Sequence, residues 1–402
     1  MHIKKSECRK ILMYIITIVL LLTNYTSYYC FLGKLSKEEV MIIPLIICLI
    51  IFMWYVWKKK KIKKQLIVIG ILLISNIIIS SIWDELSFSP EVLMLISAII
   101  CAIIVTTVVK KREIVDCYVT ILVFLAIYSL IAAYIILPLH MQGRINFFPI
   151  VQDVDRSFLD MYFSMALRTY SVPRNSGFCR EPGVYQFFLL IGIYFAIEHQ
   201  EKSKKNSFQI IVLIITMLTT LSAIAYITSI VCIIMFMKKY NYKYSAKKML
   251  LTLGIVVISI IVVFLLIKSN DRISKELIRT FGKWSLDSES NSLQVRWSGI
   301  VANLSLFLEK PLLGWGLVTS WLEIIDRFGY RDVTGTTFIG FSAFGIMFGI
   351  IIHLLFWKSC KSNKNGNLLW FLALMLSSLS QNLIITNFFW VFLFFSYSKT
   401  EV

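Results

Sequence analysis

The chain has 402 residues, of which 58% are hydrophobic and only 16% are charged. Soluble globular domains contain about 45–50% apolar and about 25% charged residues, so the composition excludes an ordinary soluble protein. The formal net charge of +18 would favour nucleic-acid binding in a soluble chain. The order of the apolar and basic segments indicates instead that the positive charge reflects the orientation of the chain in a membrane.

Eight apolar runs follow one another along the chain. A helix of roughly 20 apolar residues spans a bilayer, and each of these runs predicts one membrane-spanning helix. The sequence therefore predicts an all-α polytopic membrane protein, with residues 1–402 forming a single integral membrane domain. The runs cover residues 11–31, 40–57, 65–83, 92–109, 114–139, 184–197, 249–267 and 338–357.

Two further apolar runs, 208–237 and 368–397, have polar residues near their middle. Lysines flank the first run on both sides, which places both of its ends on the same side of the membrane. The polar segment 219–222 then predicts a turn between two short helices, and one long tilted helix is the alternative. If the second run also turns back, at residues 377–382, the chain has about 12 transmembrane helices, with 11 as the alternative.

Lysine indicates how the chain is oriented. Short lysine-rich blocks at 58–64, 110–112, 238–239 and 247–248 separate the apolar runs. Basic residues in short loops near helix ends face the cytoplasm, so this pattern predicts that both termini are cytoplasmic. Orientation and attraction to inner-leaflet lipids account for the net charge. The sequence therefore predicts membrane lipids, and no nucleic acid, as partners.

Arginine is concentrated in two long polar segments, 140–183 and 268–337, which this topology places outside. The predicted spans carry almost no ionisable residues in their cores, whereas ion-driven transporters need such residues. Guanidinium groups bind phosphate oxygens in bidentate geometry, so we expect anion binding in these two outer loops. The arginines concerned are Arg144, Arg156, Arg168, Arg174, Arg180, Arg272, Arg279, Arg296, Arg327 and Arg331.

The first outer loop ends in a cluster of basic residues around one carboxylate. Arg168, Arg174 and Arg180 precede Glu181, and Pro182 follows it. Proline suits the first turn of a helix because it needs no backbone donor there, so we expect Glu181 at a helix N-terminus. A carboxylate beside arginines stays ionised and could act as a base or as an orienting group. The alternative is an ion pair at the rim, which contributes little stability.

We expect short interfacial helices in both outer loops, and the second outer loop predicts two helices. Residues 271–284 alternate apolar and basic positions at helical spacing, which is typical of an amphipathic helix lying on the outer leaflet. Residues 293–308 form a second helical pattern that Pro311 and the following glycines end. Arg296 lies near the start of this helix, where it could reach a ligand bound by the first loop. Candidate substrate-binding residues are Arg168, Arg279, Arg327 and Arg331.

Three motifs, in this order, carry a family resemblance. They are RNSGFCREPG at 174–183, TTLS at 219–222 and LQVRWSGIVANLSLFLEKPLLGWG at 293–316. A polytopic chain with this layout resembles bacterial O-antigen and capsular polysaccharide repeat-unit polymerases (Wzy-type). It is also similar to the O-antigen ligases of the same superfamily. The resemblance covers roughly residues 165–355, and the remainder agrees only in hydropathy.

The resemblance implies a membrane glycosyltransferase that needs no metal or other cofactor. Such an enzyme takes a glycan from undecaprenyl pyrophosphate and adds it to a second lipid-linked repeat unit, at the outer face of the bacterial cytoplasmic membrane. By position, Arg174, Arg180 and Arg296 would bind the pyrophosphate, and Glu181 would serve as base or orienting group. A chain-length regulator and a flippase are the protein partners that the resemblance implies.

One departure from the ligase pattern favours a polymerase. Ligases typically carry a His-Asn element about eleven residues before a glycine within a helix, as the resemblance implies. Counting back from Gly345 leads to Thr334 and Gly335, with no histidine nearby. A ligase remains an alternative. A flippase for lipid-linked oligosaccharides is a second alternative, although its basic residues should line a path at membrane depth. A non-catalytic membrane scaffold is a third.

Overall fold

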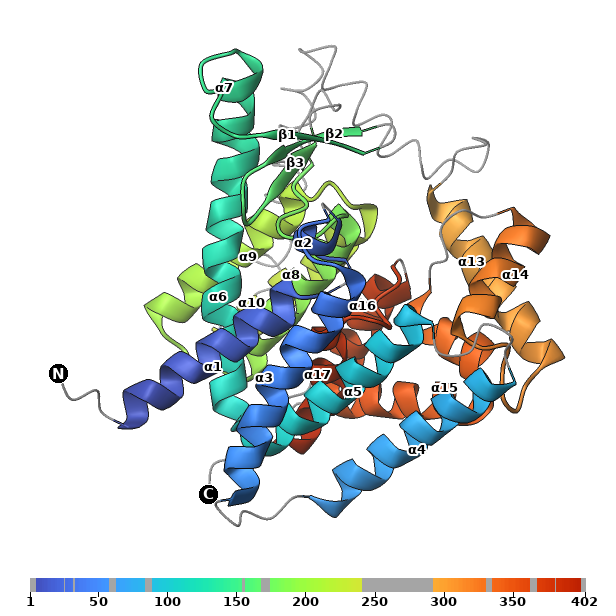
Figure 1. Ribbon diagram of the computed structural model, residues 1–402. Helices are drawn as coiled ribbons and strands as arrows, with labels where there is room; N and C mark the ends of the chain where they lie inside the picture. Colours follow the sequence, from blue (N-terminus) through green and yellow to red (C-terminus); the bar gives the residue numbers. More distant parts are fainter. Residues whose placement is uncertain are drawn as a thin grey trace.

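The computed structural model describes residues 5–24, 26–31, 33–57, 63–83, 89–153, 156–167, 174–240, 292–329, 335–361, 367–379 and 381–398. Helices dominate these parts of the chain (Figure 1). Several sequence-based expectations lie outside the described residues. They are the span 249–267, the interfacial helix 271–284, and the candidate residues Arg168, Arg279 and Arg331.

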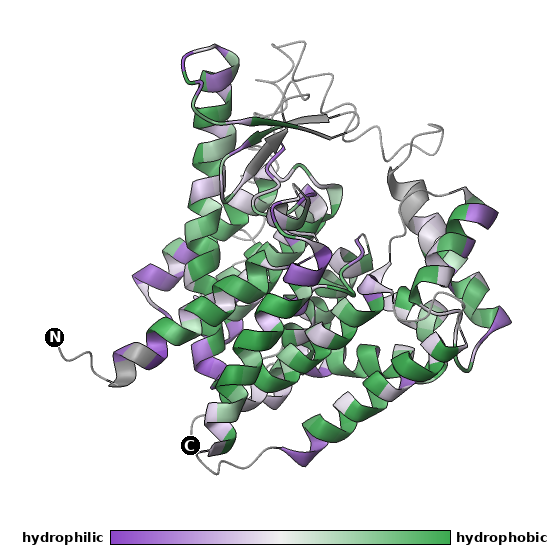
Figure 2. Ribbon diagram, viewed as in Figure 1, coloured by the Kyte–Doolittle hydropathy of each residue, from purple (hydrophilic) through white to green (hydrophobic). Residues whose placement is uncertain are grey.

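The described part of the chain contains five helices that are long and apolar enough to cross a membrane. Hydrophobic residues cover most of their length (Figure 2). This confirms a mainly helical, strongly apolar architecture, while the total number of crossings stays a prediction. The five are α3 (Lys37–Trp57), α4 (Lys64–Ile82), α5 (Pro90–Val108), the segment Lys111–Met141 made of α6 (Lys111–Ile131), η1 (Ala132–Ile136) and α7 (Leu137–Met141), and α15 (Thr336–Cys360).

Both apolar runs with polar middles are broken, as predicted. The first run forms α9 (Lys204–Thr219) and α10 (Ala223–Lys239), which meet at a turn where Leu221 has a positive φ of 49°. The second run forms α16 (Asn367–Leu379) and α17 (Asn387–Phe394), with a non-helical stretch between them. Such breaks at membrane depth are tolerated where other parts of the protein cover them.

Helix α8 (Pro182–Glu198) lies at the centre of the structure. Every side chain from Gly183 to Ile197 is buried, and α6, α9, α10 and α16 pack around the helix. Tyr118 of α6 donates to the carbonyl of Phe188 at 2.9 Å, which ties the two helices together. The remaining helices are α1 (Lys5–Leu22), α2 (Tyr28–Phe31), α13 (Ser292–Glu309), α14 (Leu317–Phe328) and the 3-10 turn η2 (Phe395–Tyr397).

Lys239 is one of the lysines that the sequence assigns to orientation, yet its side chain is 5% exposed. Its Nζ donates to the carbonyl oxygens of Ala196 at 2.7 Å and Gln200 at 2.8 Å, where α8 ends. A cation at a helix C-terminus pairs with the last carbonyls and with the negative end of the helix dipole. Lys239 therefore joins the end of α10 to the end of α8.

Replacing this ammonium tests its contribution. We expect Lys239→Met to lower the free energy of unfolding by about 1–3 kcal/mol, because two carbonyl oxygens lose their donor. The measurement is the midpoint of thermal unfolding in detergent, with Lys205→Met as control, since Lys205 is an exposed lysine of the neighbouring α9. An equal decrease in both variants would show that the loss of a positive charge, and not the capping contact, matters.

The first outer loop differs from the expectation of short interfacial helices. Its described part contains three strands, β1 (Ile150–Asp153), β2 (Arg156–Asp160) and β3 (Met165–Leu167), which form an antiparallel sheet in the order β1-β2-β3. Pairing between the three strands satisfies their backbone N–H and C=O groups. An ion pair of 2.5 Å between Lys34 and the buried Asp160 fixes the sheet to the loop after α2.

Helix α15, which contains the predicted span 338–357, folds back on itself at Gly345. This glycine has φ 80° and ψ −172°, outside the helical region. The rings of Phe341 and His353 lie 5.2 Å apart, although twelve residues of a straight helix extend about 18 Å. Gly349 allows the close approach, because a Cβ there would overlap the ring of Phe341. α15, which is long and apolar enough to cross a membrane, therefore consists of two helical halves that pack against each other.

The loop between α13 and α14 binds the broken backbone of α15. Ile346 N donates to the carbonyl of Pro311 at 2.8 Å, and Trp315 N donates to the carbonyl of Ser342 at 2.9 Å. A third bond of 2.9 Å joins Gly316 N to the carbonyl of Ala343. These three bonds replace helical hydrogen bonds that the break removes. The glycine-rich end of the third motif therefore stabilises the fold of α15.

Candidate functional site

The N-terminus of α8 has the predicted form. Glu181 is the N-cap residue with extended backbone angles, and Pro182 lies in the first turn. The carbonyl of Glu181 accepts hydrogen bonds of 3.1 Å from the backbone N–H groups of Val184 and Tyr185. The Glu181 side chain is partly exposed and forms no capping hydrogen bond. Its carboxylate therefore lies at the N-terminal end of a central buried helix. We call this region, around Glu181 and Pro182, the entrance of α8.

Arg174 lies where the first motif meets the turn between α9 and α10. Its Nη2 donates to the carbonyl of Leu221 at 3.4 Å, a long hydrogen bond. Its Nε atom is buried and has no hydrogen-bond partner. A guanidinium has five N–H donors, and a buried donor without a partner is costly. Arg174 is thus the arginine of the cluster whose surroundings leave donor capacity for a ligand.

Asn175 holds this arginine in place, and the sequence did not single it out. The residue is 1% exposed, and its Nδ2 donates to Ser129 at 3.0 Å and Thr219 at 3.2 Å. Its Oδ1 accepts from Gly177 N at 3.0 Å, a local turn that asparagine favours. The polar spacing in RNSG was the available signal, but the partners on α6 and α9 are distant in sequence. Asn175 is therefore a positioning residue.

Arg180 is exposed at the same entrance. Its backbone N–H donates to the carbonyl of Thr26 at 2.8 Å, and an isolated bridge pairs Ser27 with Cys179. The loop after α1 thus holds the chain just before α8. The structure therefore brings Arg180 and Glu181 together as chain neighbours, with Arg174 anchored at the adjoining α9–α10 turn.

Three helices begin close to this entrance and run in the same direction. Gln186 of α8 donates to Thr228 of α10 at 3.2 Å, and the rings of Phe187 and Phe389 lie 6.0 Å apart, joining α8 to α17. Ser222, the N-cap of α10, has a buried hydroxyl without a hydrogen-bond partner. Helix N-termini present free N–H donors and a partial positive charge, which favour anions. This geometry suits an anionic group outside α8.

The non-helical stretch between α16 and α17 connects the two outer loops. Gly183 lies so close to the Gln381 side chain that a Cβ on Gly183 would overlap the Gln381 amide. The carbonyl of Gln381 accepts hydrogen bonds of 2.5 Å and 3.1 Å from the hydroxyl and N–H of Thr336. Gly335, just before Thr336, lies against Asn303 of α13. Through Gln381, Thr336 and Gly335, the N-terminal end of α8 is therefore connected to α13 of the second outer loop.

Arg296 lies in the second turn of α13, as expected from the helical pattern. It precedes Asn303 by seven residues, or about 10 Å along the helix. Asn303 accepts a hydrogen bond of 2.5 Å from Ser342. This contact packs α13 against α15, and no described contact joins Arg296 to Arg174.

Arg327 has a different environment from that of Arg174. Its guanidinium forms ion pairs with Glu309 at 2.7 Å and Glu323 at 2.5 Å and lies 5.1 Å from the Trp315 ring centre. Hydrogen bonding to Glu309 raises the pKa of Arg327. Glu309 and Glu323 therefore already pair with the positive charge of Arg327. In this position the side chain joins α13 to α14, and substrate binding by it stays a prediction.

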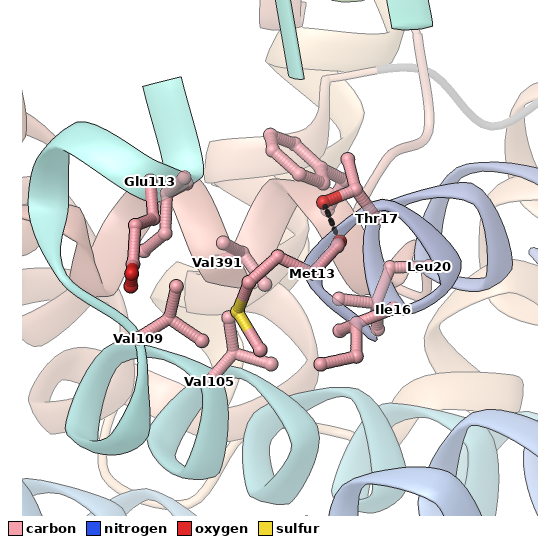
Figure 3. Close-up of a pocket in the computed structure, with 10 residues that line it drawn as sticks. Met13, Ile16, Thr17, Leu20, Val105, Val109, Glu113 and Val391 are labelled. Atoms are coloured by element: carbon pink, nitrogen blue, oxygen red, sulfur yellow. Dashed lines mark hydrogen bonds between the residues drawn. The ribbon is translucent and has the colours of Figure 1, made fainter. Parts of the chain in front are cut away.

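The described residues also contain an apolar pocket between α1, α5, α6 and α17. Figure 3 shows Met13, Val105 and Val391 around it, with Glu113 at one side. The Glu113 carboxylate is bound by Arg9 at 2.8 Å. None of the predicted site residues lines this pocket. Within the described residues, no group of three or more His, Cys, Asp or Glu side chains could hold a metal ion.

No protein-family model matches the sequence, and no curated protein is significantly similar to it. The functional inference therefore depends on the chain's own residues. Its main observations are a buried, incompletely paired guanidinium, a carboxylate at a helix entrance, and three helix N-termini that lie together.

Proposed function

We propose that the protein is a polymerase of lipid-linked oligosaccharide repeat units, acting at the outer face of the bacterial cytoplasmic membrane. The observation that carries this proposal is the environment of Arg174. Its buried Nε has no hydrogen-bond partner and its Nη2 makes one long bond, beside a turn where α10 begins. Such a site favours a polyanion like pyrophosphate.

The proposed reaction needs an anion site next to a proton acceptor. A hydroxyl oxygen of the acceptor sugar attacks the anomeric carbon of the donor, and the bond from that carbon to the pyrophosphate oxygen breaks. Arg174 and Arg180, with Arg296 from the second loop, stabilise the negative charge on the leaving undecaprenyl pyrophosphate. Glu181 accepts the hydroxyl proton or orients the hydroxyl. Two lipid-linked glycans are consumed, and one longer lipid-linked glycan is formed.

The proposed topology places this chemistry outside. Lys111 and Lys239 lie next to the C-terminus of α8, whereas Arg180 and Glu181 lie at its N-terminus. With about 12 crossings and both termini cytoplasmic, Glu181 faces the outer cavity. A flippase that delivers repeat units and a chain-length regulator are the protein partners that such a polymerase needs.

Deletion of the gene in its own host tests the proposed function. We expect single repeat units to remain on the cell surface while long polysaccharide chains disappear, because only their joining is lost. The measurement is the length distribution of surface glycans on a gel, with the gene restored on a plasmid as control. Loss of even single repeats would instead indicate flipping. Long chains that accumulate on the lipid carrier would indicate a ligase.

A further inference from the structure

The stretch between α16 and α17 lies against the entrance of α8, and none of its side chains takes part in the proposed transfer step. Gln381 in this stretch is 7% exposed, and its amide occupies the space next to Gly183, where a Cβ would overlap Nε2. Gly183 lies in the first turn of α8, two residues after the N-cap residue Glu181. The Gln381 amide is therefore held near the carboxylate that the proposed reaction uses.

One residue of α15 fixes the backbone of this stretch. The N–H and the hydroxyl of Thr336 both donate to the carbonyl of Gln381, and the hydroxyl oxygen of Thr336 accepts from Leu383 N at 2.8 Å. Asn382 lies between these two bonded residues, so the backbone that carries its side chain is held on both sides. Binding groups that are supported in this way keep a defined position.

The two amides of this stretch have hydrogen-bonding capacity that the described part of the protein does not use. The Oδ1 atom of Asn382 is buried and has no hydrogen-bond partner. None of the described hydrogen bonds uses the side-chain amide of Gln381. A buried polar atom without a partner is costly, and native proteins pair nearly all such atoms with protein, water or ligand. These neighbouring amides therefore suit a ligand that forms hydrogen bonds.

The same capacity continues one turn further along α8. Gln186 follows Gly183 by three residues and so lies on the same face of the helix. The residue is fully buried, and its Nε2 donates to Thr228 of α10 at 3.2 Å, whereas its Oε1 has no hydrogen-bond partner. A water molecule that bridges Gln186 to a ligand at the entrance would supply the missing donor. Polar contacts therefore extend from the entrance into the helix bundle.

The chemistry of these groups fits the hydroxyl groups of a sugar. A hydroxyl both donates and accepts hydrogen bonds, and a side-chain amide offers two donors and an acceptor. The amides carry no charge, so they add little to phosphate binding, which arginine serves better. A metal cation is disfavoured, because Arg174 and Arg180 together outweigh the one carboxylate of Glu181 at the entrance. The amides therefore favour the neutral, hydroxylated part of a lipid-linked glycan.

We propose that the stretch between α16 and α17 recognises the sugar joined to the pyrophosphate, with Gln381 and Asn382 hydrogen-bonding its hydroxyl groups. The inference rests on the proposed function and adds the residues that select the sugar. Arg174 and Arg180 bind the pyrophosphate, and the two amides bind the adjoining sugar ring. No bond forms or breaks at the amides, so they contribute to orientation and specificity. A sugar without the matching hydroxyls leaves the amides unpaired and binds more weakly.

Native mass spectrometry of the purified full-length protein tests this site with two lipids. One is undecaprenyl pyrophosphate without a glycan, and the other is the lipid-linked repeat unit extracted from host cells that lack this gene. We expect Gln381→Ala to weaken binding of the lipid-linked repeat unit about tenfold, the effect of losing one or two hydrogen bonds. Binding of undecaprenyl pyrophosphate should not change. Gln200→Ala, at the other end of α8 and about 25 Å away, should change neither affinity.

A second variant tests the contact with α8. Gly183→Ala places a methyl group where the Gln381 amide lies, so we expect it to displace the amide and to produce the same selective loss. Because both changes act on one group, Gly183→Ala combined with Gln381→Ala should lose no more than Gln381→Ala alone. Losses that add in the double variant would show that Gly183 does not act through this amide.

Three further results would overturn the proposal. They are equal affinity of the unmodified protein for the two lipids, an equal loss for both lipids in Gln381→Ala, and unchanged binding in both Gln381→Ala and Asn382→Ala, which would mean that the amides hold only water. If the unmodified protein binds neither lipid, the proposed function itself fails. Thermal unfolding in detergent identifies a variant that does not fold, and Asn382→Ala then replaces Gln381→Ala.

Discussion

Gly345→Ala is expected to destabilise the protein by about 3 kcal/mol or more. Gly345 has φ 80° and ψ −172°, a conformation that residues with a side chain adopt only under strain. A Cβ at this position would also overlap the carbonyl oxygen of Leu312. That oxygen belongs to the loop that forms three hydrogen bonds with the broken helix, so it cannot move without breaking them.

The matched control is Gly143→Ala. Gly143 has a similar φ of 71°, but no heavy atom lies within 4 Å of a Cβ built on it. The control therefore measures the strain of a positive φ alone, at about 1 kcal/mol, while Gly345→Ala adds the strain of its ψ of −172° and the overlap with Leu312. The measurement is the midpoint of thermal unfolding in detergent for both variants. A similar small shift in both would mean that the contact with Leu312 is not a constraint on α15.

Arg174→Ala is expected to lower the rate of polymer formation by a hundredfold or more. Removing one donor that stabilises developing negative charge typically costs about 10²–10³ in rate. Arg174 makes one long hydrogen bond, from Nη2 to the carbonyl of Leu221, so its guanidinium keeps N–H donors for the leaving pyrophosphate. The measurement is the fraction of surface glycan longer than one repeat unit in cells that express the variant.

Two further variants separate charge from geometry. Arg174→Lys keeps the positive charge but lacks the planar fork of donors, so we expect it to restore only part of the activity. Lys205→Ala removes an exposed positive charge of α9 outside the candidate site and should leave chain lengths unchanged. Equal amounts of each variant in the membrane must be verified. Normal chain length in Arg174→Ala would remove this residue from the proposed mechanism.

Local signals in the sequence predicted the helix ends near the candidate site. Pro182 marked the start of α8, and polar residues near Thr219 and Gln381 marked the two breaks, because short-range chemistry determines each of these features. The predicted position of Glu181 at a helix N-terminus is confirmed. Its part in catalysis stays a prediction.

Contacts between distant segments could not be predicted in the same way. Asn175 has partners on α6 and α9, and Gln381 contacts Gly183 and Thr336, so each role depends on tertiary packing. The break at Gly345 also depends on a distant segment, because the loop before α14 forms hydrogen bonds with the backbone groups of α15 on both sides of the break. A hydropathy pattern records how apolar α15 is, but not that its halves fold together. The short strands of the first loop were missed because their pairing also depends on other segments.

The central position of α8 has a consequence for how the protein is made. This helix is enclosed by α6, which is synthesised earlier, and by α16 and α17, which are synthesised later. Phe389 and Phe392 of α17 contact Phe187 and Tyr194 of α8. Until the ribosome has produced α16 and α17, lipid or a chaperone must cover these aromatic side chains. The core is therefore complete only after α17 has been made, and a chain that stops before α16 lacks one wall of it.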